Sequence, residues 1–105
     1  MDQRDETLVL ERGEERIDLR GRLDAELALR SPVAVRLWRE ADEYVADAPD
    51  LNLYAFGTTK DEAIAHLRVQ IAEQHRRLEE LGNRLAPPAR VVADRLRAVV
   101  QRHDG

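Results

Sequence analysis

Apolar and polar residues alternate through the first half of the chain, from Leu8 to Phe56. The alternating apolar positions are Leu8, Leu10, Ile17, Leu19, Val33, Val35, Leu37, Tyr44, Ala46 and Ala48. Strict alternation puts one set of side chains on a buried face and the other set in water, as in an antiparallel sheet with one wet face. The pattern therefore predicts a sheet region over 1–57.

Turn signals divide this region into short strands. Pro32 cannot donate to a strand ladder and marks a strand boundary or an edge. We interpret 40–43 as a hairpin loop and Pro49-Asp50 as a turn before a last strand over 51–56. Segment 23–30 is ambiguous, because its residue types favour a helix while its alternation favours a strand. We predict a strand there.

The periodicity becomes helical after Gly57. Thr59 and Glu62 have the spacing of a capping box, in which the threonine oxygen accepts from a backbone N–H and the glutamate reaches back. An apolar stripe follows at Ile64, Leu67, Ile71, Leu78 and Leu81. Gly82 can end the helix in a left-handed cap. The sequence predicts a main helix over 58–82, roughly 33 Å long at 1.5 Å per residue, which is longer than a small sheet covers.

A second helix is predicted over 87–103. Pro87 and Pro88 suit a first helical turn, and the apolar stripe consists of Val92, Leu96, Val99 and His103. We expect this helix to pack on the overhanging end of the first one, in its own chain or in a partner. The predicted fold is a single α+β domain over 1–105, with a mostly antiparallel sheet of four to six strands, a long helix on one face and a C-terminal helix.

Composition narrows the function classes. The chain of 105 residues has no cysteine, which excludes disulfides, thiolate metal sites and cysteine nucleophiles and suits a cytoplasmic protein. No apolar run approaches the roughly 20 residues of a membrane helix. The first residues are acidic and polar, unlike a secretory signal. We therefore expect a cytoplasmic protein that does not contact membranes.

Charge is distributed unevenly along the chain. Residues 1–57 carry 8 basic and 14 acidic side chains, whereas residues 58–105 carry 9 and 7. A net charge of −4 does not favour general nucleic-acid binding, which requires a positive face. A locally basic C-terminal segment could still contact phosphate, so a DNA- or RNA-binding regulator is our alternative function. Its candidate residues are Arg84, Arg90, Arg95, Arg97 and Arg102.

The sequence contains no pattern that indicates catalysis. His66 and His75 are nine residues apart in one helix, on opposite faces, so they cannot share a metal. The five glycines are scattered and form no phosphate loop. We predict no catalytic residue, metal or cofactor, and keep a metal-dependent nuclease built from clustered carboxylates as a third hypothesis. Trp38 and Tyr54 are assigned to core or interface packing rather than to base stacking.

Two segments carry a family resemblance. The stretch Tyr44-Val-Ala-Asp-Ala-Pro-Asp-Leu51, followed by Gly57-Thr-Thr-Lys-Asp-Glu-Ala63, resembles the HicB antitoxin family and its small stand-alone relatives. The shared pattern is a strand, a Pro-Asp-Leu turn, a short strand and a capped long helix. It covers roughly residues 33–81, and the family's glycine-cysteine step before Gly57 is absent here.

The resemblance implies a degraded ribonuclease-H-like unit that is not an enzyme, binds a small toxin ribonuclease and self-associates. We therefore predict an antitoxin-type protein that neutralises a small basic toxin through an acidic sheet region. The candidate partner-binding residues are Asp42, Glu43, Asp47 and Asp50. We also expect a homodimer or higher homo-oligomer. Its candidate interface residues are Leu78, Leu81, Leu85, Val92, Leu96 and Val99.

Overall fold

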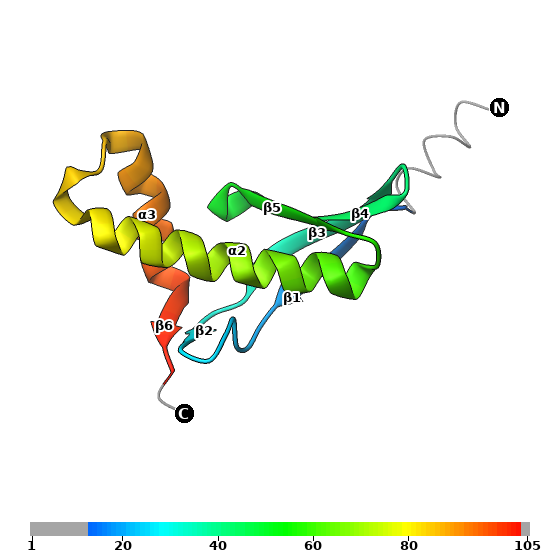
Figure 1. Cartoon of the computed structure of the whole chain (residues 1–105), viewed down its shortest axis with the longest axis horizontal. Helices are drawn as coiled ribbons and strands as arrows, with labels where there is room; N and C mark the ends of the chain where they lie inside the picture. Colours follow the sequence, from blue (N-terminus) through cyan, green and yellow to red (C-terminus); the bar gives the residue numbers. More distant parts are fainter. Residues whose placement is uncertain (1–12, 104–105) are drawn as a thin grey trace.

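A four-stranded antiparallel sheet covered on one face by a long helix forms most of the molecule (Figure 1). The computed structural model describes residues 13–103. The strands are β1 (Glu15–Leu19), β3 (Val33–Glu40), β4 (Glu43–Ala48) and β5 (Leu53–Gly57), in the spatial order β1-β3-β4-β5. The helix is α2 (Lys60–Leu81). This architecture confirms the predicted α+β class.

The alternating residues of the strands bury the face that α2 covers. Val33, Val35 and Leu37 of β3 are all buried, while the residues between them are exposed or half-buried. The facing side chains of α2 include Leu67 and Ile71, which are fully buried. Period-two and period-3.6 patterns therefore meet at one core, as the sequence predicts. The alternating positions Leu8 and Leu10 lie outside the described residues.

The start of α2 is fixed by the predicted cap. The Thr59 hydroxyl accepts from the backbone N–H of Glu62 at 3.0 Å. The Glu62 carboxylate in turn accepts from the backbone N–H of Thr58 at 2.6 Å and from its hydroxyl at 2.9 Å. These bonds from Thr58 lower the pKa of Glu62 because they favour its charged form. The threonine half of the capping box is present as predicted, whereas the glutamate half is shifted by one residue, because Glu62 binds Thr58 and not the N–H of the cap Thr59.

The far end of α2 is covered by the chain's own C-terminal part (Figure 1). Helix α3 (Pro87–Val99) follows the short 3₁₀ turn η2 (Gly82–Arg84), and strand β6 (Val100–Arg102) pairs antiparallel with β2 (Leu27–Leu29). Gly82 has a φ of 54° and its N–H bonds to Leu78 O, which ends α2. The buried side chains gathered here are Leu23, Leu27, Leu29, Leu78, Leu85, Ala93, Leu96 and Val100.

Three predicted boundaries are wrong. The second helix ends at Val99 rather than at 103, because the following residues pair with β2 and the His103 N–H bonds to Glu26 O at 2.7 Å. The strand expected over 23–30 is reduced to β2, since the Asp24 carboxylate accepts two backbone N–H groups and forms a turn. Leu51 lies in the 3₁₀ turn η1 (Pro49–Leu51) rather than in the last strand.

Within residues 13–103, no helix combines the length and the apolar character needed to cross a membrane.

Candidate functional site: the outer face of the sheet

The outer face of the sheet, which points away from α2, is the surface with the most distinctive side chains. Strand register arranges these side chains in rows across the sheet. One row runs Arg16, Arg36, Asp47 and Tyr54. The next row runs Trp38, Val45 and Phe56, and a last pair at the hairpin end is Glu40 and Glu43. The solvated face of an antiparallel sheet is commonly polar, and large apolar side chains gathered on it often mark an interaction site.

Three of the four aromatic residues of the chain gather on this face. We call Trp38, Val45, Tyr54 and Phe56 the aromatic patch. Val45 is only 3% exposed, whereas Tyr54 is 59% and Phe56 44% exposed. The Tyr54 and Phe56 rings meet edge to face, with centroids 5.7 Å apart. The patch surrounds a hollow of about 280 Å³ that Glu40 and Asp47 complete.

Charged groups hold the patch in place. The Arg36 guanidinium donates to the Asp47 carboxylate at 3.1 Å and lies 5.8 Å from the centroid of the Trp38 ring. The Trp38 indole N–H donates to the Glu40 carboxylate at 2.9 Å. A chain of contacts thus runs from Asp47 through Arg36 and Trp38 to Glu40. The Trp38 indole is held by Arg36 over its ring and by Glu40 at its N–H, which preorganises the patch for a partner.

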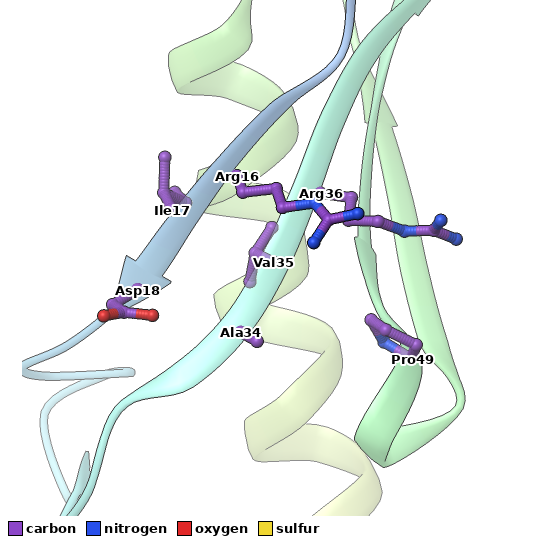
Figure 2. Close-up of a pocket in the computed structure, with 7 residues that line it drawn as sticks. All are labelled: Arg16, Ile17, Asp18, Ala34, Val35, Arg36 and Pro49. Atoms are coloured by element: carbon purple, nitrogen blue, oxygen red, sulfur yellow. The ribbon is translucent and has the colours of Figure 1, made fainter. Parts of the chain in front are cut away.

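A second hollow lies on the same face, over β1 and β3 (Figure 2). It measures about 510 Å³ and is lined by Arg16, Asp18, Arg36 and Pro49, among others. Figure 2 shows the Arg16 side chain lying across β3 toward Arg36. Each arginine already has an acidic neighbour, Glu14 at 3.7 Å and Asp47 at 3.1 Å. The hollow therefore has little excess positive charge with which to bind an anion.

Comparisons with protein-family models, with curated proteins and with solved structures gave no significant match.

The four acidic residues predicted to bind a partner do not form one cluster. Asp42 lies in the β3–β4 turn, and Glu43 begins β4. Asp47 lies on the outer face, paired with Arg36. Asp50 lies in η1, beyond the other end of β4, so the strand separates it from Asp42 by about 20 Å. Only Glu43 and Asp47 border the aromatic patch.

The residues predicted to form an oligomer interface belong mainly to the core of the single chain. Leu78, Leu85 and Leu96 are at most 6% exposed. Val92 and Val99 are half-buried against the same cluster. Leu81, at 37% exposure, is the most accessible of the six. The overhang of α2 is thus filled by α3 and β6 of its own chain, which removes the reason for placing a partner there.

Two of the five arginines proposed for nucleic acid are bound to the chain itself. Arg97 pairs with the Glu79 carboxylate at 2.7 Å and with Asp94 at 3.3 Å, and these acids raise its pKa. Arg95 donates to the backbone carbonyl of Asp50 at 3.2 Å. Arg84, Arg90 and Arg102 are exposed.

The histidines have separate structural surroundings. The His66 ring nitrogen Nδ1 lies 2.6 Å from the carbonyl of Phe56, to which it donates. His75 is half-buried on α2, and burial lowers its pKa because the charged form loses hydration. Within residues 13–103, no three His, Asp or Glu side chains lie close enough together to hold a metal ion.

The aromatic patch is the feature that the sequence analysis missed. The sequence predicts core or interface packing for Trp38 and Tyr54, and the exposure of Tyr54 excludes the core for that residue. The sequence signal for this patch is the alternation of even and odd residue positions along the strands. Even positions of β3 and β5 and odd positions of β4 share one face once the hairpin turns are placed. Only the register brings these positions into adjacent rows.

Proposed function

We propose that this chain is a non-enzymatic protein-interaction module whose outer face binds a basic protein partner. The observation that carries the proposal is the aromatic patch bordered by the carboxylates of Glu40 and Glu43, with Asp47 beside it already paired with Arg36. Aromatic rings bind apolar side chains and arginine guanidinium groups, and are enriched at interfaces. The surrounding carboxylates attract positive charge and speed association with a basic surface.

The HicB-like motifs support a more specific partner, a small toxin ribonuclease. The Tyr44–Leu51 stretch spans β4 and η1, and Gly57–Ala63 spans the end of β5 and the capped start of α2. Each motif therefore occupies the type of element that the family pattern implies. In this proposal the chain is an antitoxin-type protein that covers the toxin's active surface. We place it in the cytoplasm, which its lack of cysteine fits.

Nucleic-acid binding by the C-terminal arginines has less support. A phosphate-binding surface needs several uncommitted cations on one face. Arg95 and Arg97 are engaged within the chain, and Asp94, which directly precedes Arg95, is a further ion-pair partner of Arg97. The outer face is no better suited to phosphate, because acidic groups surround its aromatic rings.

Co-expression with a small basic protein encoded by a neighbouring gene tests the proposal. We expect the two proteins to co-purify and the complex to lose the partner's ribonuclease activity. Phe56→Glu should weaken the complex at least tenfold, because it places a charge in the centre of the patch. Val91→Glu is the matched control, since Val91 is 50% exposed on α3, outside the patch.

Three results would contradict the proposal. The first is the absence of any complex with such a partner. The second is a complex in which the Phe56→Glu variant and the Glu43→Arg variant both bind the partner as tightly as the wild type does. Glu43→Arg reverses a charge beside the patch. A complex that Val91→Glu weakens as much as Phe56→Glu would place the interface elsewhere.

A further inference from the structure

Strand β5 is an outer strand of the sheet and lacks the features that normally protect an edge. Its sequence, Leu-Tyr-Ala-Phe-Gly, contains no charge and no proline. The opposite edge strand β1, Glu-Arg-Ile-Asp-Leu, is heavily charged. Natural sheets protect their edges with charges, prolines or bulges, because an edge without them pairs with other strands. The unprotected edge is thus confined to one side of the sheet.

The hydrogen-bonding groups of β5 that point outward belong to Tyr54 and Phe56. The β3–β4 turn has two residues between Glu40 and Glu43, so these two form a hydrogen-bonded pair. Alternation across β4 then directs the backbone groups of Ala55 toward β4 and those of its two neighbours away from it. The hydrogen bond from His66 to the Phe56 carbonyl agrees with this assignment, because a side chain of α2 can reach that carbonyl only if it points away from β4.

Exposed apolar side chains lie along the same edge. Tyr54 and Phe56 are two of the five large apolar residues that are exposed among those described. A third is Val69 of α2, which is 47% exposed and follows His66 by three residues. Residues three apart share one side of a helix, so Val69 lies on the side of α2 that His66 turns toward β5. The edge therefore offers both backbone groups and apolar contacts.

We infer that a second copy of this chain pairs its β5 with this β5, antiparallel and centred on Ala55. In this register Tyr54 of one copy faces Phe56 of the other, and the two pairs exchange four backbone hydrogen bonds. Each pair sets two aromatic rings opposite each other on the outer face, an arrangement that stabilises sheets. The carbonyl of Phe56 has two lone pairs and can accept from His66 and from the partner together.

A second copy fits this edge better than a strand of a charged partner does. Strand β5 has no charge that a charged partner could complement. A two-fold axis at Ala55 places the outward backbone groups of Tyr54 in one copy opposite those of Phe56 in the other, so each donor meets an acceptor. The same axis brings the two Val69 side chains toward each other beside the strands. The interface is small compared with a standard interface of about 1,600 Å², so the dimer depends on concentration. Pairing leaves the outer face open, and the inference does not depend on the proposed function.

Sedimentation velocity on the full chain over a wide concentration range tests this pairing. We expect the mass to rise from 12.0 kDa toward twice that value. Amide exchange at Tyr54 and Phe56 should slow only at concentrations where the dimer forms. In a mixture of labelled and unlabelled chains, the α-protons of the two Ala55 residues should give an intermolecular NOE. The two residues face each other as a non-hydrogen-bonded pair at the centre of the interface, where the Cα atoms approach most closely.

Tyr54→Pro removes an outward N–H without touching the β4–β5 ladder, and proline is tolerated at an edge. It should weaken the dimer at least tenfold. Val69→Glu, an exposed helix position, should weaken it as well through charge repulsion and without a folding problem. Val91→Lys is the control and should leave the association constant unchanged.

The inference is overturned if the chain stays monomeric throughout, or if the dimer survives Val69→Glu with both amides still exchanging rapidly. It is also overturned if only a second protein protects these amides. Failure of this pairing would leave partner binding by Phe56 and Glu43 measurable on the monomer, so the two proposals can fail separately.

Discussion

Gly57 at the end of β5 lies against the backbone of Ala63 in the first turn of α2. A Cβ at Gly57 would be 2.4 Å from the amide nitrogen of Ala63 and 2.9 Å from its Cα. Both residues belong to the motif on which the family resemblance depends. The glycine is needed because sheet and helix meet there with no room for a side chain.

Gly57→Ala should therefore destabilise the fold by about 1–3 kcal/mol, the usual cost of overpacking, and toward the upper end because the obstructing atoms are backbone. Urea unfolding followed by circular dichroism measures the change. Gly13→Ala is the control, because a Cβ there meets nothing within 4 Å. Equal effects of the two substitutions would show that the close approach does not matter.

Ala41 in the β3–β4 turn has a φ of 56°, a conformation that L-residues other than Asn and Asp seldom adopt. Ala41→Gly should stabilise the protein by roughly 0.5–1 kcal/mol, since relief of the backbone strain exceeds the extra entropy of the unfolded chain. Thermal unfolding would detect a higher Tm. Ala65→Gly, at an exposed position of α2, should have the opposite sign. A lower Tm for Ala41→Gly would contradict this account of the turn.

Asp24 connects the β1–β2 loop to α2. Its carboxylate accepts from Arg76 at 2.7 Å, and this hydrogen bond is the main reason why its pKa falls from 3.8 to about 2. Because the folded pKa is the lower one, the stabilisation is present above about pH 4 and disappears as the pH falls toward 2. Asp24→Asn should cost about 1 kcal/mol at neutral pH, allowing for solvent screening.

The test of this ion pair is the difference in unfolding free energy between the wild type and Asp24→Asn at several pH values. The difference should shrink below pH 4. Asp18→Asn is the control and should change the free energy of unfolding little at neutral pH, because the Asp18 carboxylate is exposed and its ion pair with Arg20 is long, at 3.8 Å. A difference for Asp24→Asn that does not depend on pH would rule out the ion pair as its cause.

Leu96 of α3 is fully buried in the cluster at the far end of α2. Leu96→Ala should cost about 2–5 kcal/mol through lost burial and a cavity. Leu81→Ala, at a residue that is 37% exposed, should cost less than about 1 kcal/mol. Chemical unfolding at low protein concentration measures both. If Leu96→Ala instead shifted only the monomer–dimer equilibrium, the residue would belong to an interface after all.

Local patterns were sufficient for some elements and insufficient for others. The Thr59–Glu62 spacing and the stripe containing Leu67 and Ile71 predicted α2 almost to the residue, because a cap and a helical face depend on neighbours in sequence. The end of α3 was missed. The backbone of residues 100–102 finds its partners in β2, more than 70 residues earlier, and no local pattern carries that information.

The candidate site shows the same division. The acidic residues were found by composition, but register placed only Glu43 and Asp47 beside the aromatic patch. The sequence by itself determined the α+β class, the two faces of each strand and the capped helix, because these follow from periodicity and short-range hydrogen bonds. Only the tertiary structure decided which strands are neighbours, that the α2 overhang is covered by its own chain, and that Trp38, Tyr54 and Phe56 share one face. Those outcomes depend on contacts between residues far apart in the chain, and such contacts are settled only when the whole core packs.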